Sequence, residues 1–299
     1  SGLQALIGAS QSIWCGDAQT VLAGGAESVT HMPQLIFSKE HDARKARGLN
    51  ESLMNDGLMC SVTDRSMGVL CEGLAQQEKI SRKEQDDYAF ESYCRAVRAQ
   101  EAGFFKEEIL AVGLSGKEKM ITDETIRKNI ERSSFDRFSG AFEKKGTITA
   151  ANSASPCDGA AMVLACSPDV VERFKVKPVA RMVEHVSIAG DPAATFTLAG
   201  AAVEALLKKA NRRIGEIDIF EISEAFAAQM IFTQRSLQVP FSKINPHGGD
   251  IALGHPLGAA GARGLVSLIH TLRREEKKRG VACACLGGGG AVAILVERC

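Results

Sequence analysis

One histidine stands in a setting that suits chemistry. His255 lies in "ALGHPLG", between Gly254 and Pro256 and just ahead of a predicted helix that starts near residue 259. Pro256 fixes its own φ and keeps the preceding residue out of the helical region, so the imidazole is held on a stiff loop. The flanking glycines leave bare backbone that a substrate can approach closely. A loop histidine is more often solvent-exposed without a function, and His247 is expected only to pack or to hydrogen-bond.

A thiol stands next to four consecutive glycines in "CACLGGGGAVA". Cys285 ends a predicted buried strand, and Gly287 to Gly290 follow it. Glycine-rich backbone can present N–H groups to a developing oxyanion, and a cysteine can serve as an acid or a base. The alternative is a small apolar residue before a tight hairpin, and Cys283 is expected to be of that kind.

Two further segments carry weaker signals. In "EISEAFAAQ", Ser223 and Glu224 stand where a strand meets a helix, at the edge of a sheet where side chains can meet a substrate, although a helix N-cap explains Ser223 better. In "GTITAANSASPCDGAA", small residues precede a turn at Asp158 and Gly159. A thiol, an imidazole and glycine-rich backbone at three strand ends favour acyl chemistry on a thioester over hydride or phosphoryl transfer.

The elements that must position these residues alternate between strands and helices, which is typical of a layered α/β fold. A helix is expected over 3–14, followed by a strand over 19–23 and a glycine turn at Gly24 and Gly25. Later strands are expected within 160–167, 176–190, 216–223 and 281–298, the last range holding two strands joined by glycines. Helices are expected over 198–211, 224–237 and 260–280.

The region 31–146 differs from the rest because its charges are dense and its strands few. It is interpreted as a long, partly helical insertion over an α/β core. Its firmest element is a helix over 81–103, where Ser81 and Glu84 form a capping box and Gly103 marks the stop.

The composition excludes several classes of partner. The 299 residues include 36 basic and 36 acidic side chains, so nucleic acid and membrane surfaces are poor candidates, whereas self-association is favoured. Nine cysteines without a disulfide or zinc spacing indicate a reducing compartment and no metal. With no signal peptide and no membrane-spanning run, the chain is expected to be soluble and cytoplasmic.

The combination of motifs resembles the thiolase family. "SGLQAL…AGGAESVTHMP", "GTITAANSASPCDGAA", "SEAFAAQ", "GGDIALGHPLGAAGARG" and "CLGGGGAVA" stand in that family's order over essentially the whole chain. The resemblance implies two similar βαβαβαββ halves, formed by 1–30 with 147–175 and by 176–299, and a CoA-binding loop domain inserted at 31–146. It implies an acyltransferase that cleaves 3-ketoacyl-CoA with coenzyme A, or runs the reverse condensation.

The resemblance also implies partners. Acyl-CoA and CoA are the expected substrates, with no covalently bound cofactor. A homodimer or homotetramer is expected, and a β-oxidation multienzyme assembly is a further candidate partner. A mitochondrial or peroxisomal matrix is the alternative to the cytoplasm.

Residue roles follow from the resemblance as well. His255 would activate a nucleophilic cysteine and help to bind a thioester oxygen, and Cys285 would move a proton at the carbon α to the thioester. Gly287 would donate its N–H to the other oxyanion hole. Ser223, where the family mostly has Asn or His, would hold a water in the first hole. The residues implied for CoA and acyl binding are Arg127, Ser134, Met67, Ser153, Phe226 and Gly249.

One departure concerns the nucleophile. The family carries it in C-x-S-G, and this sequence opens at that Ser-Gly, which places the cysteine two residues before Ser1. The chain is interpreted as a fragment, with a nicked protein or an incomplete, inactive one as alternatives. The competing functional hypothesis is a thiolase-like CoA-binding or assembly subunit with little turnover. A decarboxylating condensing enzyme is less favoured, because such enzymes generally lack a cysteine like Cys285.

Overall fold

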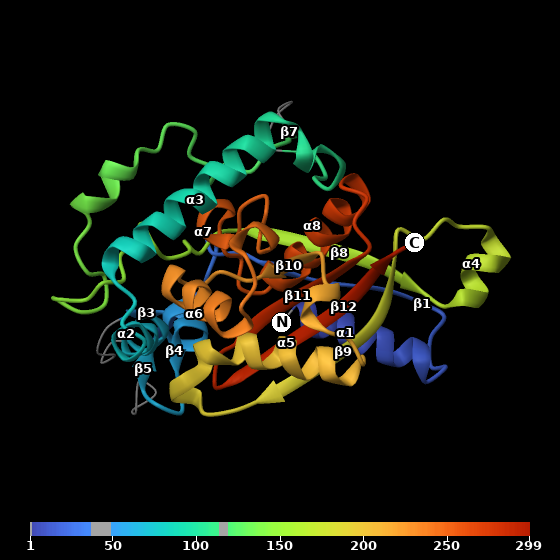
Figure 1. Ribbon diagram of the computed structural model, residues 1–299, viewed down its shortest axis with the longest axis horizontal. Helices are drawn as coiled ribbons and strands as arrows, with labels where there is room; N and C mark the ends of the chain where they lie inside the picture. The colour runs from blue at the N-terminus through green and yellow to red at the C-terminus, as the bar shows by residue number, and fades with distance from the viewer. Residues whose placement is uncertain (1, 37–48, 114–118) are drawn as a thin grey trace.

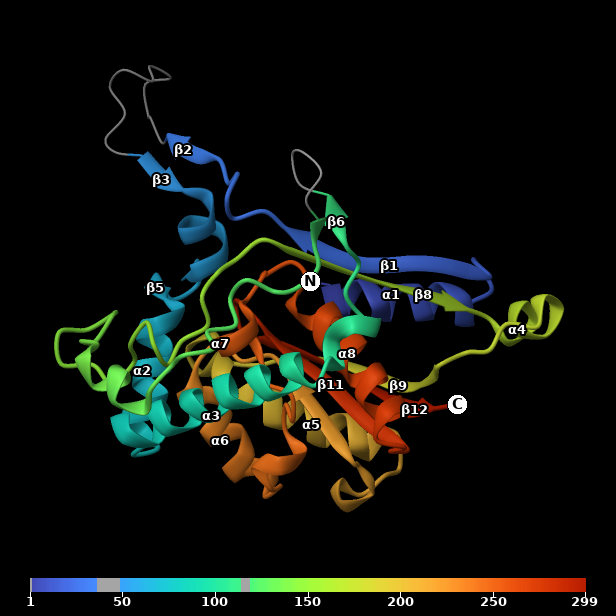
Figure 2. The ribbon, with the colours of Figure 1, turned by 90° about the horizontal axis from the view of Figure 1, so that it is seen from above.

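Two sheets enclose a central pair of helices. In the computed structural model, which describes residues 2–36, 49–113 and 119–299, the helices α1 (Gly2–Trp14) and α8 (Ala260–Arg274) lie between the sheets (Figures 1 and 2). The larger sheet has the order β10–β11–β12–β9, which are Ile219–Ile222, Arg279–Leu286, Gly290–Arg298 and Ala180–Ala189. The smaller sheet pairs β1 (Thr20–Glu27) with β8 (Gly159–Cys166) in antiparallel fashion.

Apolar periodicity explains why these two helices occupy the middle layer. Leu3, Leu6 and Ile7 of α1 are each 1% exposed, at the i, i+3, i+4 spacing of one helical face. Leu265 and Leu268 of α8 join them in one core cluster. Because each fully buried aliphatic side chain contributes about 1.5–3 kcal/mol, this layer holds both sheets in place.

The second half of the chain follows the expected βαβαβαββ order, with one strand reduced to a single bridge. β9, α5 (Leu198–Lys209), β10 and α6 (Ala227–Leu237) come first, and α8, β11 and β12 come last. Between α6 and α8, Ile244 forms an isolated parallel bridge to Phe220. The side-chain amide of Asn245 continues this pairing, because it bonds both the N–H and the C=O of Ile222 at 2.8 Å.

The first half contains a matching unit. α1, β1 and β8 correspond in order to α8, β11 and β12, and each helix is followed by an antiparallel strand pair. On the β1–β8 face away from the helices, Leu22, Met162 and Leu164 are exposed, whereas α5 covers β9 and β12 (Figure 2).

The expected glycine turn at Gly24 and Gly25 is wrong, because β1 runs through both residues. A Cβ atom on Gly24 would lie 2.0 Å from the Ala161 carbonyl oxygen, and one on Gly25 would lie 1.9 Å from that of Gly258. Glycine is therefore required here for the close approach of neighbouring backbones, which is its other role within a strand.

The charge-rich region lies against one end of the layers. Its longest helix, α3 (Arg82–Glu101), has the expected Ser81–Glu84 capping box and packs on α6 and on the short helix α7 (Asp250–Leu253) (Figure 1). Its other elements are β2 (Gln34–Ile36), β3 (Leu49–Glu51), β4 (Met59–Cys60), β5 (Arg65–Ser66), α2 (Met67–Gln77), β6 (Val112–Gly113) and β7 (Lys119–Met120). α4 (Pro168–Phe174) follows β8. Within the described ranges, no helix is long and apolar enough to cross a membrane.

Candidate active site

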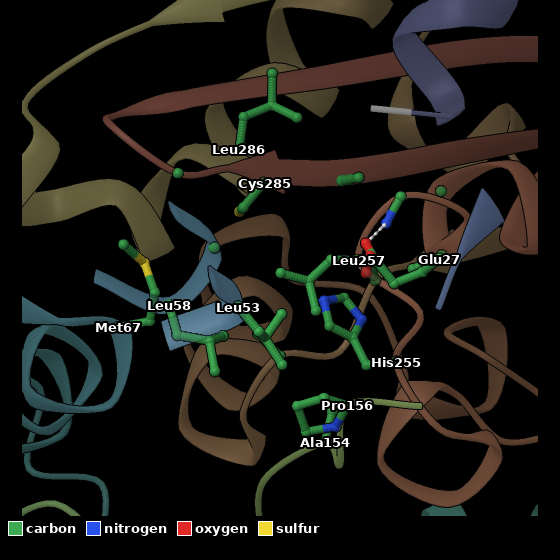
Figure 3. A pocket seen from close by; sticks show the side chains of 18 of the residues that line it. Glu27, Leu53, Leu58, Met67, Ala154, Pro156, His255, Leu257, Cys285 and Leu286 are labelled. Carbon is green, nitrogen blue, oxygen red and sulfur yellow. Dashed lines mark hydrogen bonds between the residues drawn. The ribbon is translucent and has the colours of Figure 1, made fainter. Parts of the chain in front are cut away.

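The four residues with a predicted catalytic role border one cavity of about 580 Å³ between the layers and the charge-rich region. They are His255, Cys285, Ser223 and Gly287. His255 and Cys285 enter it from different elements, and Leu53, Leu58, Met67 and Leu257 lie around them (Figure 3). The loop before α8 and the end of β11 thus bring an imidazole and a thiol to one apolar space.

His255 is held by its backbone and by its ring. Gly254 has φ +86°, and a Cβ there would lie 2.6 Å from the Cys157 sulfur, so only glycine fits before the histidine. The His255 N–H donates to the Ser155 carbonyl at 2.9 Å. Its Nδ1 lies 3.0 Å from Oδ2 of Asp250. The stiff loop expected from the sequence is present, and a buried carboxylate fixes the ring orientation as well.

The same loop is fastened to the first half of the chain. The Gly258 N–H donates to Glu27 at 3.0 Å, and the Gly258 carbonyl accepts from the Gly2 N–H at 3.0 Å. Leu3 of α1 lines the cavity. The N-terminus of α1 therefore lies beside the His255 loop.

Cys285 sits at the end of β11, before a hairpin in which Gly288 and Gly289 have φ +80° and +89°. The expected pair of strands joined by glycines is confirmed. Burial raises the pKa of the Cys285 thiol to about 12, so it is protonated near neutral pH. Its sulfur lies 3.9 Å from Nε2 of Gln229. As a resting thiol, Cys285 is equipped to donate a proton.

The N-cap explanation of Ser223 is wrong. Helix α6 begins at Ala227 and its N-cap is Phe226, which gives no side-chain cap. The Ser223 hydroxyl instead donates to Oδ2 of Asp250 at 2.5 Å, while its N–H donates to the Cys283 carbonyl. Ser223 therefore borders the cavity while its hydroxyl proton is donated in a hydrogen bond to the Asp250 carboxylate.

The residues expected to bind CoA fall into separate groups. Met67 and Phe226 line the main cavity, and Phe226 packs edge-on against Phe196. Arg127 and Ser134 line a different hollow of about 710 Å³, which also receives the cations Lys128 and Arg137.

Ser153 and Gly249 border neither of these two hollows. The Ser153 hydroxyl donates to the Thr149 carbonyl at 2.7 Å, while its neighbour Ala154 borders the cavity. Gly249 packs so closely that a Cβ would lie 2.2 Å from the carboxyl carbon of Glu224. Both residues are enclosed by neighbouring parts of the chain and contribute to packing.

His247 and Cys283 pack as expected. The His247 ring lies edge-on to Phe104, and burial lowers the pKa of His247 to about 4, so the ring is neutral at pH 7. Cys283 is 1% exposed in the core cluster of the larger sheet.

Two buried charges were missed from the sequence. Asp250 is fully buried, and Arg263 of α8 donates to its Oδ1 at 2.6 Å. Burial alone would raise the pKa of Asp250, but the Arg263 guanidinium and His255 outweigh it and hold that pKa well below its usual range. An aspartate within the apolar stretch "GGDIALG" was the available signal, because a buried charge needs a partner.

Glu224, expected with Ser223 at a turn where side chains can meet a substrate, does not border the main cavity. It is 1% exposed and accepts hydrogen bonds from Tyr88 at 2.6 Å, Asn245 at 2.8 Å and Ser92 at 3.0 Å. Burial raises the pKa of Glu224. Its contacts tie α3 to the segment after β10, so the charge-rich region is fixed against the strand end that carries Ser223.

With this geometry established, sequence matches identify the class of protein. Residues 1–169 match the thiolase N-terminal domain and residues 176–298 match the thiolase C-terminal domain. The chain belongs to the thiolase family.

Particular relatives agree with this assignment. A "Probable acetyl-CoA acyltransferase" of Staphylococcus aureus (strain COL) is 39% identical over 303 residues, which cover all of this chain and 77% of the relative. The human mitochondrial 3-ketoacyl-CoA thiolase superposes with a TM-score of 0.95 at 34% identity, covering all of this chain and 77% of that one. The Bacillus anthracis acetyl-CoA acetyltransferase gives 0.95 at 32% identity, with the same coverage.

These matches confirm three predictions from the sequence: the thiolase family, the α/β thiolase fold and the acyltransferase class. They do not favour the alternative of a binding or assembly subunit with little turnover. One solved neighbour is described as the human mitochondrial thiolase in complex with CoA.

Proposed function

We propose that this site cleaves 3-ketoacyl-CoA with coenzyme A to give acetyl-CoA and a shortened acyl-CoA, or runs the reverse condensation. The observation that carries the proposal is the meeting of His255, Cys285 and Ser223 at one largely apolar cavity. A thioester needs a nucleophile, a proton carrier and oxyanion donors, and this cavity supplies the last two.

The reaction uses a cysteine two positions before Ser1, where the family pattern places it. His255 takes the proton of that thiol, and the thiolate attacks the 3-keto carbon. The bond between that carbon and the α carbon breaks, its electron pair goes to the α carbon, and the Cys285 thiol protonates it. The sulfur of CoA then attacks the carbonyl carbon of the acyl-cysteine and gives its thiol proton to the Cys285 thiolate. The bond from that carbon to the cysteine sulfur breaks, the cysteine thiolate takes its proton back from His255, and acyl-CoA is released. The Gly287 N–H serves as the second oxyanion donor.

CoA is the substrate that we assign to the charge-rich region, the proposed loop domain of 31–146. Arg127, with Lys128 and Arg137, provides positive charge for its phosphates, and Ser134 lies in the same hollow. The pantetheine arm passes Met67 and Phe226 toward His255. Ser153 and Gly249 support that passage by packing.

The finer assignments rest on the resemblance and on composition. The halves are 1–30 with 147–175, and 176–299. The net charge of zero supports a homodimer or homotetramer. We assign the protein to the cytoplasm, in keeping with its bacterial relatives, and regard a β-oxidation multienzyme complex as its candidate partner.

The test is thiolysis of acetoacetyl-CoA by a polypeptide that includes a cysteine two positions before Ser1. We expect His255→Ala to lower kcat about 10²–10⁴-fold, because the base is lost. His270→Ala, a partly exposed histidine on α8, is the control and should keep the wild-type rate. Mass spectrometry should detect an acyl adduct on the added cysteine. Wild-type turnover by His255→Ala would overturn the proposal.

A further inference from the structure

We propose that Asp250 is a positioning residue for this reaction, because its buried carboxylate fixes the proton of His255 on Nδ1 and orients the hydroxyl of Ser223. Both side chains then present acceptor atoms to the cavity. This inference rests on the proposed function, since the second ring nitrogen of His255, Nε2, matters only if it acts on a thiol.

The carboxylate of Asp250 accepts several hydrogen bonds from its neighbours. Asp250 opens the four-residue helix α7, and the turn at Gly254 folds the chain back so that His255 meets it. Its Oδ2 accepts from Ser223 at 2.5 Å and from the Glu224 N–H at 3.0 Å, and lies 3.0 Å from His255 Nδ1. An ionised carboxylate only accepts, so the proton between it and each of these side chains belongs to the side chain.

Neighbouring charges favour the ionised form of Asp250. Arg263 of α8 binds its Oδ1 at 2.6 Å. Three other carboxyl groups face Arg263: Glu221 of β10, Glu108 after α3 and Asp123. Burial raises the pKa of all three, that of Glu108 to about 7, so they compete weakly for the guanidinium at neutral pH. Arg263 and Asp250 thus form a neutralised buried pair.

Two consequences follow for the chemistry. With Nδ1 protonated, His255 offers the Nε2 lone pair to the nucleophilic thiol, and the imidazolium formed by proton transfer stays beside a carboxylate. With its only proton given to Asp250, Ser223 offers lone pairs, so it can hold a water by accepting a hydrogen bond. The water donates one of its hydrogens to Ser223 and can donate the other to the thioester oxygen.

The first test reads the tautomer directly and needs no turnover. In ¹⁵N-histidine NMR of the 299-residue chain near neutral pH, the His255 signal, assigned with His255→Gln, should be that of the Nδ1–H form. Asp250→Asn places an amide N–H₂ beside the ring and should convert His255 wholly or partly to the Nε2–H form. Asp218→Asn, whose carboxylate caps two N–H groups near β11, is the matched control and should change nothing.

A wild-type chain with His255 in the Nε2–H form would overturn the proposal, whether or not the variant folds. An unchanged tautomer in folded Asp250→Asn would overturn it equally. Because neither readout involves catalysis, the positioning role stands or falls separately from the proposed reaction.

The second test separates positioning from binding. In a polypeptide with the upstream cysteine, Asp250→Asn should lower kcat for thiolysis about 10²–10⁴-fold, with KM changed less than about threefold. A loss expressed only in KM would assign Asp250 to substrate binding instead. If His255→Ala leaves thiolysis intact while the NMR result holds, the proposed function fails and the tautomer assignment survives.

Discussion

Cys285 and His255 face the same cavity but are held in different electrostatic states. Burial keeps the Cys285 thiol protonated, with its pKa near 12. His255 is tied at 3.0 Å to Asp250, a carboxylate that Arg263 keeps ionised. Cys285 can therefore donate a proton and His255 can accept one. Cleavage of a carbon–carbon bond next to a thioester requires one group of each kind.

The assignment of Cys285 as the proton donor predicts the behaviour of Cys285→Ser. A serine hydroxyl is a far weaker acid, so it cannot protonate the departing α carbon, and we expect thiolysis to fall about 10²–10⁴-fold. Transfer of an acetyl group between acetyl-CoA and labelled CoA should persist, because that exchange breaks no carbon–carbon bond. In the wild type, deprotonation of Cys285 should not lower the rate of thiolysis between pH 7 and 10, since the pKa of this thiol is about 12.

Both reactions are measured in a polypeptide that carries the upstream cysteine. Cys94→Ser, a partly exposed thiol on α3, is the control. Equal losses of thiolysis and exchange in Cys285→Ser would contradict the assigned proton transfer.

The sequence was informative about residues whose neighbours are local. His255 and Cys285 were found because glycine and proline next to them already reveal a stiff loop and a bare turn. Asp250 was missed because its contact with His255 depends on the fold. On a regular helix, two residues that are five positions apart would not face each other. Only the break of α7 at Gly254 brings them together.

At the scale of elements, the charge-rich region is fixed to the core by buried polar contacts as well as by apolar packing. Glu72 on α2 is 1% exposed and accepts from the N–H and hydroxyl of Thr147 and from the N–H of Ile148, at 2.8–2.9 Å. These residues lead directly into the segment that ends beside His255. The Glu72 carboxylate therefore links helix α2 to the segment that borders the cavity at Ala154 and Pro156.

Replacing that carboxylate should loosen this junction. Glu72→Gln keeps the shape but turns one acceptor oxygen into a donor that faces backbone N–H groups, so we expect a loss of about 2–4 kcal/mol in the free energy of unfolding. Urea denaturation measures it. Glu101→Gln, an exposed position at the end of α3, should stay within about 0.5 kcal/mol of wild type. Identical stability of both variants would show that Glu72 is dispensable.

The helices could be predicted from local sequence patterns, whereas close approaches between backbones distant in sequence could not. An apolar, helix-like run was sufficient to predict α1, and the capping box with the stop at Gly103 was sufficient to predict α3. The strand through Gly24 and Gly25 was misinterpreted as a turn, because the partners that demand glycine, Ala161 and Gly258, are distant in sequence. The third strand of the second half could not be predicted as a single bridge at Ile244 for the same reason.

At the scale of the whole molecule, the layers join distant segments and bury ionisable groups between them. Glu108, after α3, is placed beside α8, where Ser267 donates to its carboxylate at 3.2 Å. Burial raises the pKa of Glu108 from 4.5 to about 7, and nearby Arg263 only partly opposes this shift. The stability of the fold is thereby coupled to pH near neutrality.

The sign of this coupling can be tested with Glu108→Gln. The pKa of Glu108 is higher in the folded than in the unfolded protein, so its protonated form stabilises the fold below pH 4.5, and this contribution is lost as pH rises to about 7. Glutamine imitates the protonated form at every pH. Relative to wild type, the variant should therefore gain about 2–3 kcal/mol in unfolding free energy between pH 5 and pH 8.

Urea denaturation at both pH values measures this gain, and taking the difference between proteins cancels the other titrating groups, such as Glu221 and Asp123. Glu107→Gln is the matched control, because that neighbouring side chain is 64% exposed and pairs only at the surface with His270 and Arg273. Its difference from wild type should vary by less than about 0.5 kcal/mol over the same range. A Glu108→Gln difference that is flat with pH, or that favours wild type more at pH 8, would contradict a buried, protonated Glu108.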